Sequence, residues 1–219
     1  MEEVYRRRAR PWRRWLAPPA PLLHDPAELS IDAPLGPCNL YIGSAGTYAP
    51  GYVNVDLAIM PGVDVACNAE LLPFPDACFT RVECDAVLEH TPDPDRIVRE
   101  IERVLAPGGY AHLVVPFCHP FHAYPHDYRR FTPQGLRLLA GGLEVVAEGW
   151  RTGPTATLLV FVIEYAKLWC PWRPLRAVVH GVLGWVLFPL RYLDVLLRRS
   201  PNAYVLGNHC YIWLRKRER

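Results

Sequence analysis

The chain has 219 residues, enough for one domain with a full hydrophobic core; 51% of them are hydrophobic and 21% are charged. Its formal net charge of +2 is too small to indicate a nucleic-acid partner, and no RNA- or DNA-binding signature is present. The 7 cysteines include no CxxC pair, which is typical of a reducing compartment rather than of a disulfide framework. We therefore expect a cytoplasmic protein that binds no nucleic acid.

Residues 1–37 form an arm ahead of the predicted domain, which spans residues 38–219. The beginning of the arm is rich in arginine, carries Trp12 and Trp15, and is interrupted by prolines, which argues against the apolar core of a secretory signal. Such an arm is either a solvated tail or a contact to an anionic membrane surface, which attracts arginine and tryptophan. Both interpretations are open.

The first predicted strand, Asn39–Ile42, runs directly into Gly43, Ser44, Ala45 and Gly46. These small residues allow a ligand to approach the backbone closely. In a parallel sheet ligands bind at the carboxyl ends of the strands, which is where this loop begins. The four residues therefore belong to a candidate ligand site.

A second short strand, Tyr52–Val55, ends at Asp56. A carboxylate in this position can accept two hydrogen bonds from a ribose diol, so the pair of features indicates a ligand that contains a nucleoside. The segment from Gly43 to Asp56 is short for a helical crossover, which needs about a dozen residues or more. We expect the first helix to be reduced to a turn.

The next two predicted strands, Val63–Ala66 and Arg81–Cys84, are also followed by small or polar residues. Asn68 and Ala69 come after the first of these strands, and Asp85 comes directly after the second. Their places at the carboxyl ends of strands add them to the candidate site. For Asn68 the alternative is an Asx turn, in which the side chain binds the backbone two residues on.

A helix is predicted over Pro94–Leu105, where apolar residues recur on one face and charged residues on the other. Pro107, Gly108 and Gly109 end it, and we interpret these glycines as turn-makers. The strand that follows, Tyr110–Val115, leads back to the ligand edge of the sheet.

The loop after this strand, FCHPFHAYPHDYRRFTP, is dense in titratable side chains. We take His126, Asp127 and Tyr128 as candidate catalytic residues. If the reacting group of the substrate is a hydroxyl, His126 or Asp127 would be the base that removes its proton. In the alternative interpretation Tyr128 packs and the arginines form ion pairs. The spacing of the histidines matches no zinc signature, so no metal is predicted. A helix over Thr132–Leu139 ends the loop.

A strand at Glu144–Gly149 is followed by an insertion, residues 155–199, and by a last strand at Ala203–Leu214. The insertion holds two apolar segments. Pro189, Arg191 and Asp194 break the second well short of the about 20 uninterrupted apolar residues of a spanning helix, so neither segment is expected to cross a bilayer. Tryptophans beside arginines favour a place in the membrane interface; burial in the core or in a homodimer interface is the alternative. Because this connection leaves the sheet at its carboxyl edge, the helices are predicted to cover the acceptor site.

Five short motifs occur in order along the chain: GSAG, NVD, LLPFPDACF, AVLEH and RVLAPGG. With these motifs the chain resembles the class I methyltransferases that use S-adenosylmethionine. The resemblance implies an α/β, Rossmann-like fold with a seven-stranded, mostly parallel sheet and an antiparallel last strand. The helical insertion predicted at residues 155–199, between the last two strands, is a departure from a minimal domain of this family. It implies S-adenosylmethionine as the cofactor, bound by the residues of the candidate site: Gly43, Ser44, Ala45, Gly46, Asp56, Asn68, Ala69 and Asp85.

The resemblance also implies methyl transfer to a small or lipid-linked acceptor, with oxygen, nitrogen and carbon acceptors not distinguished. Asn68 stands where the family usually carries an aspartate that meets the adenine amino group. Tyr41 replaces a family acid, and Ala45 and Thr47 replace glycines. These departures favour an alternative, a non-catalytic binding module on the same fold. A dinucleotide-binding fold is disfavoured, because the third glycine is missing and Asp56 comes too soon.

Overall fold

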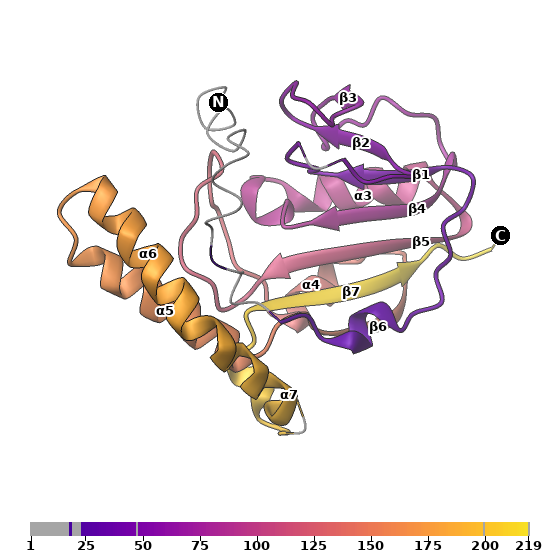
Figure 1. Cartoon of the computed structure of the whole chain (residues 1–219). Helices are drawn as coiled ribbons and strands as arrows, with labels where there is room; N and C mark the ends of the chain where they lie inside the picture. The colour runs from indigo at the N-terminus through magenta and orange to yellow at the C-terminus, as the bar shows by residue number, and fades with distance from the viewer. Residues whose placement is uncertain (1–17, 19–22, 47, 199, 219) are drawn as a thin grey trace.

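The computed structural model describes residues 18, 23–46, 48–198 and 200–218, and a seven-stranded sheet lies at its centre (Figure 1). The strands are β1 (Asn39–Ile42), β2 (Val53–Asp56), β3 (Val65–Ala66), β4 (Phe79–Asp85), β5 (Leu105–Pro116), β6 (Glu144–Trp150) and β7 (His209–Arg215). Their order across the sheet is β3-β2-β1-β4-β5-β7-β6. The first five strands pair in parallel, and β7 is antiparallel to both of its neighbours. The predicted fold class is confirmed.

The helix α3 (Pro94–Val104) packs its apolar face on the sheet. Asp93 caps its first turn by accepting a hydrogen bond from the backbone N–H of Arg96 at 3.1 Å, and Pro94 occupies the first position, where no N–H is needed. Ile97 and Ile101 are buried against the strands. The helix ends at Val104 because Leu105 is already extended and begins β5.

The helix α4 (Pro133–Leu139) begins as predicted. The hydroxyl of Thr132 caps it by accepting a hydrogen bond from the N–H of Gly135 at 3.0 Å. Between β1 and β2 the described residues form no helix, in agreement with the short crossover. The arginine-rich part of the predicted N-terminal arm lies outside the described residues.

The expected last strand, Ala203–Leu214, is wrong in its first part. Ala203–Leu206 form a 3-10 turn, η5, and β7 begins only at His209. The pairing of β7 with its neighbours explains this start, because His209 pairs with the last residue of β5 and Cys210 pairs with the last residue of β6. Residues before His209 lie beyond the ends of both neighbouring strands.

The predicted helical insertion is present as four segments: α5 (Pro154–Leu168), α6 (Arg173–Leu187), η4 (Phe188–Tyr192) and α7 (Leu193–Leu197). α5 and α6 pack on each other and project away from one end of the sheet (Figure 1). By length and composition the second segment differs from the expectation that neither can span a bilayer, because Arg173–Leu197 is a continuous 25-residue helical stretch whose most apolar 18-residue window has a mean hydropathy of 1.3. Pro189 does not break it, since it lies in the first turn of η4.

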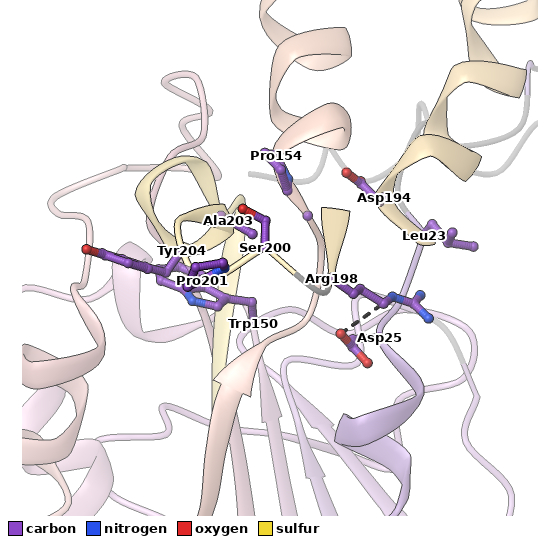
Figure 2. Close-up of a pocket in the computed structure, with 12 residues that line it drawn as sticks. Leu23, Asp25, Trp150, Pro154, Asp194, Arg198, Ser200, Pro201, Ala203 and Tyr204 are labelled. Atoms are coloured by element: carbon purple, nitrogen blue, oxygen red, sulfur yellow. Dashed lines mark ion pairs between the residues drawn. The ribbon is translucent and has the colours of Figure 1, made fainter. Parts of the chain in front are cut away.

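Asp194 ties the end of this stretch to the beginning of α5. Its carboxylate is buried and accepts hydrogen bonds from the N–H groups of Thr155, at 2.8 Å, and Ala156, at 3.1 Å. It therefore caps α5 and compensates the positive end of the helix dipole. Gly153 leaves room for it, because a Cβ atom there would lie 2.5 Å from the carboxyl carbon. Figure 2 shows Asp194 beside Pro154, at a small cavity of about 240 Å³.

We predict that Asp194→Ala lowers the free energy of unfolding by about 1–3 kcal/mol, because two N–H groups lose a buried partner. Urea denaturation followed by circular dichroism measures this loss. The matched control is Asp95→Ala, which removes an exposed acid from the first turn of α3 and is expected to cost less than about 0.5 kcal/mol. Equal losses in the two variants would contradict the capping role.

A buried ionic cluster holds the segment before β1 against the sheet. Glu28 lies in η2 (Pro26–Leu29) and is 1% exposed; its carboxylate lies 2.6 Å from the guanidinium of Arg151 and 3.2 Å from Nε2 of His112. Glu83 contacts the other ring nitrogen of His112 at 2.7 Å. Burial raises the pKa of Glu28, but hydrogen bonds from His112 and Arg151 outweigh it and bring that pKa to about 2.

The depressed pKa of Glu28 sets the sign of a pH effect. The stability that its carboxylate contributes is complete above the ordinary pKa of 4.5 and is lost as the pH falls toward 2. We predict that Glu28→Gln destabilises the protein by about 3 kcal/mol at about pH 5.5, and by clearly less at about pH 3. Urea denaturation of both proteins at the two pH values measures the difference. A difference that grows toward low pH would contradict this assignment.

Candidate functional site

A cavity of about 780 Å³ opens at the carboxyl ends of the parallel strands. This volume is in the upper part of the range for small-molecule sites, about 300–1,000 Å³. Seven of the eight predicted cofactor residues line it: Gly43, Ser44, Ala45, Asp56, Asn68, Ala69 and Asp85. His126 and Tyr128 line it from the loop after β5, whereas Gly46 and Asp127 are not among the lining residues.

The loop after β1 is a tight bend in which several residues take left-handed backbone conformations. Gly43 has φ of 77° and Gly46 has φ of 73°. A Cβ atom on Gly43 would lie 2.2 Å from Cγ2 of Val87, so only glycine fits this position. The N–H of Gly43 donates to the carbonyl of Val55 at 2.9 Å, which joins the loop to β2.

Asp56 braces the same bend from the end of β2. Its Oδ2 atom accepts a hydrogen bond from the N–H of Ala45 at 2.8 Å, and its Oδ1 atom accepts one from Ala58 at 3.3 Å. Ala45 is held at φ of 50°, a conformation that costs an ordinary residue about 1–2 kcal/mol. Each carboxylate oxygen has a second acceptor site. Asp56 therefore shapes the cavity and keeps capacity for a ligand hydroxyl.

Two further polar residues behave differently at the cavity. Ser44 is 2% exposed, and its hydroxyl has no hydrogen-bond partner among the described residues, so it is a donor and acceptor left for a ligand. Asn68 accepts a hydrogen bond from the N–H of Glu70 at 2.9 Å, which confirms the Asx turn. The Asx turn and a place in the cavity wall therefore occur together at Asn68.

Asp85, at the end of β4, is paired with Arg151 at 2.6 Å. This pair connects the cavity wall to the buried cluster around Glu28, because Arg151 binds both carboxylates. Tyr41 lines the cavity without closing it, and burial together with the charges of Asp85 and Glu83 raises the pKa of its phenol to about 12. The tyrosine in place of the expected acid is therefore a neutral hydroxyl.

The loop after β5 gives Asp127 a structural role. Its carboxylate binds two nitrogens of Arg130 and accepts a hydrogen bond from the N–H of His122 at 2.7 Å. The hydrogen bonds from Arg130 hold the pKa of Asp127 well below its ordinary value. The geometry therefore does not support Asp127 as the base. His126 and Tyr128 remain at the cavity, with ring centroids 5.5 Å apart.

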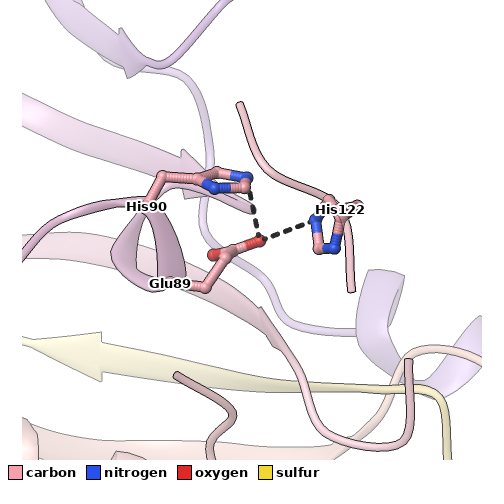
Figure 3. A group of neighbouring side chains, drawn as sticks. All are labelled: Glu89, His90 and His122. Atoms are coloured by element: carbon pink, nitrogen blue, oxygen red, sulfur yellow. Dashed lines mark ion pairs between the residues drawn. The ribbon is translucent and has the colours of Figure 1, made fainter. Parts of the chain in front are cut away.

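Three residues that the sequence analysis left out of the site come together beside this loop. Glu89 is fully buried, and His90 and His122 both approach its Oε1 atom with Nε2, at 3.7 and 3.6 Å (Figure 3). Glu89 and His90 lie in the short turn η3 (Leu88–His90), and the β5–α4 loop brings His122 to them. The AVLEH motif contains Glu89 and His90, but His122 lies 32 positions after His90 in the sequence. The motif alone therefore did not indicate the cluster.

The insertion does not form the predicted cover of the site. None of the described residues of 155–199 lines the large cavity, and the wall that faces the strand ends comes from residues 122–128. The reason is the direction of α5, which leaves the sheet after β6 and runs outward with α6 (Figure 1). The expectation of a helical lid over the acceptor is therefore wrong.

Known proteins resemble this chain in fold and, over about half of its length, in sequence. A family model described as a methyltransferase domain matches residues 52–113. The ubiquinone/menaquinone biosynthesis C-methyltransferase UbiE of Hahella chejuensis (strain KCTC 2396) is 46% identical over 112 residues, which are 48% of this chain and 45% of that protein. The enzyme of the same name from Xylella fastidiosa (strain M23) is 29% identical over 121 residues, 48% of each chain. The chain spans about half the length of these curated relatives.

Solved structures show the same fold at low sequence identity. The [4+2]-cyclase SpnF matches with a TM-score of 0.55 and 20% identity over 84% of this chain and 76% of its own. The 1,6-didemethyltoxoflavin-N1-methyltransferase of Burkholderia thailandensis, solved with S-adenosylhomocysteine, matches with a TM-score of 0.52 and 16% identity over 94% of this chain and 81% of its own. The chain has the Rossmann-like fold of these proteins.

Proposed function

We propose that this protein transfers a methyl group from S-adenosylmethionine to a small apolar or lipid-linked acceptor. The observation that carries the proposal is the bend at Gly43–Gly46, braced by Asp56 and open to the large cavity. The match of residues 52–113 to a methyltransferase domain supports it independently. When bound, S-adenosylmethionine supplies a methyl group on a positively charged sulfur, which is already activated for transfer.

The residues of the cavity fit this cofactor. The glycine bend lets its backbone come close to the ligand, and the unpartnered hydroxyl of Ser44 is available for a polar group. Asp56 has acceptor capacity for the ribose hydroxyls, and Asn68 and Ala69 form the wall where the adenine would lie. Asp85 is held by Arg151 at the same edge. These residues are the proposed cofactor site.

The acceptor would enter beside His126 and Tyr128, which line the cavity from the β5–α4 loop. For a hydroxyl acceptor, His126 is the proposed base, since Asp127 is committed to Arg130. The main contribution of the chain would be alignment of the two reactants in the cavity. The curated relatives are named as C-methyltransferases of ubiquinone and menaquinone biosynthesis, which favours an acceptor of that small, apolar kind.

We predict that the protein binds S-adenosylmethionine with a micromolar dissociation constant, and that Gly43→Ala weakens binding at least about 100-fold, because the added Cβ meets Val87. Isothermal titration calorimetry measures both values. Gly181→Ala is the matched control, since its Cβ would meet no atom within 4 Å, and it should bind like the wild type. No binding at about millimolar ligand would refute the enzyme and favour the non-catalytic binding module.

The insertion supports a place at a membrane surface, because it presents large apolar side chains to solvent. Leu168 and Trp169 at the end of α5 are each 76% exposed, and Trp172, Trp185 and Leu196 are also exposed. In the part of the chain that the structure describes, nothing packs over them, and only 11% of the most apolar window of Arg173–Leu197 is buried. Monomeric proteins rarely expose an apolar surface of this kind without a partner.

We propose that this surface lies in the membrane interface rather than that its helix crosses the bilayer. Asp194 belongs to the candidate span but is bound to the first turn of α5, which fixes the two ends of the insertion together. Arg191 lies over the rings of Phe188 and Tyr192, a pairing of cation and aromatic residues that suits the headgroup layer. On this proposal the protein associates with the membrane surface through the insertion.

We predict that the protein floats with vesicles that contain phosphatidylglycerol in a density gradient, and that the double variant Trp169→Ser, Trp185→Ser loses at least about 10-fold in partitioning. The control is Leu138→Ser, which removes an 85% exposed apolar side chain from α4, outside the insertion, and should not change partitioning. A dimer in light scattering that the double variant dissociates, without vesicle binding, would refute the membrane contact in favour of a homodimer interface.

A further inference from the structure

We propose that Glu89, His90 and His122 bind a divalent transition-metal ion in the wall of the large cavity. The ligand atoms of these three residues all lie within 4.8 Å of one another. The Oε1 atom of Glu89 is 3.7 Å from Nε2 of His90 and 3.6 Å from Nε2 of His122. Ligands about 2.1 Å from a tetrahedral ion are about 3.4 Å apart, so small side-chain movements suffice for coordination.

The imidazole ring of His90 is held in the tautomer that a metal ligand needs. Nδ1 of His90 donates a hydrogen bond to the carbonyl of His126 at 2.5 Å. Nδ1 of His122 lies 3.2 Å from the carbonyl of Pro120, 3.5 Å from the carboxylate of Asp127 and 3.4 Å from a guanidinium nitrogen of Arg130. With its proton on Nδ1, His90 can bind a metal ion through Nε2, and Figure 3 shows a ring nitrogen of both His90 and His122 directed at the carboxylate of Glu89. A backbone carbonyl on the second nitrogen is the usual support of a metal-binding histidine.

Glu89 supplies the second, independent observation. The residue is 0% exposed, and neither of its carboxylate oxygens has a hydrogen-bond partner among the described residues. A buried carboxylate without compensation costs several kcal/mol. The nearby guanidinium of Arg130 is already bound by Asp127. A divalent cation between the carboxylate and the two imidazoles would satisfy the free oxygens and neutralise the charge.

The donor set defines the class of metal and the chemistry available. Two imidazoles and one carboxylate suit Zn²⁺, Fe²⁺ or Mn²⁺ and leave at least one coordination position free. His90 and His122 line the same cavity as His126 and Tyr128, so a free position would face the proposed acceptor site. An acceptor oxygen bound there would have a lowered pKa. This role deepens the proposed function and rests on it, whereas the metal site itself does not.

The test uses the full chain after treatment with a chelator and its removal by dialysis. Zn²⁺ titrated calorimetrically is expected to bind at one site per chain with a dissociation constant of about 1 µM or tighter. Co²⁺ should give visible absorption bands in the range of a four- or five-coordinate nitrogen and oxygen site. Glu89→Gln and His122→Gln should each weaken Zn²⁺ binding at least about 100-fold.

His180→Ala is the matched control, because His180 is an exposed histidine on α6, outside the cluster, and its loss should leave Zn²⁺ binding unchanged. Circular dichroism and the affinity for S-adenosylmethionine measured with chelator present show whether each variant is folded. Failure of the proposed function appears as loss of S-adenosylmethionine binding in the wild type, which is a separate measurement. Absence of Zn²⁺ binding at about 100 µM, or equal binding by the wild type and Glu89→Gln, would overturn the metal site and leave a protonated His122 as the partner of Glu89.

Discussion

The hydrogen bond from the N–H of Ala45 to the carboxylate of Asp56 is the contact on which the site depends. It holds Ala45 in a left-handed backbone conformation, which is normally unfavourable for a residue with a β-carbon. The hydrogen bond therefore stabilises the bend although position 45 is not a glycine. The same carboxylate then forms part of the cavity wall. The side chain of Asp56 therefore stabilises a backbone conformation that a glycine at position 45 would adopt without strain. It also lines the cavity at the edge of the sheet.

Buried charge in this protein is arranged in connected pairs. Arg151 joins Asp85 at the cavity to Glu28 below it, and His112 joins Glu28 to Glu83 on the central strands. Each of these carboxylates has a cationic or hydrogen-bonding partner, as buried charges require. Glu89 is paired more loosely, since its nearest cationic partners are the imidazoles of His90 and His122, at 3.7 and 3.6 Å, and neither of its oxygens has a hydrogen-bond partner in the described part of the chain. Perturbed buried carboxylates are concentrated at functional sites. The proposed metal ion would give Glu89 a close cationic partner between His90 and His122.

The sequence predicted what depends on local patterns. The strand ends that carry Gly43, Asp56 and Asp85 were correctly placed, because short apolar runs followed by small or acidic residues define them. The role of Asp127 was not predictable, since it depends on Arg130 folding back onto it within the loop. Glu89 was missed for a related reason: complete burial beside a residue 33 positions away is a tertiary property, and no spacing in the sequence encodes it.

The insertion and the β5–α4 loop are joined through the segment that begins β7. The carbonyl of Asn208 accepts a hydrogen bond from the N–H of Phe117 at 2.9 Å, and the side-chain amide of Asn208 donates to the carbonyl of Cys118 at 2.8 Å. These bonds fix the beginning of the loop that carries His122 and His126. The same segment follows η5, where the insertion returns to the sheet and where Gly207 packs against Trp150. Because the helix pair and the loop share this anchor, the proposed membrane contact of the insertion would also set the orientation of the cavity toward the lipid, without the helices covering the cavity.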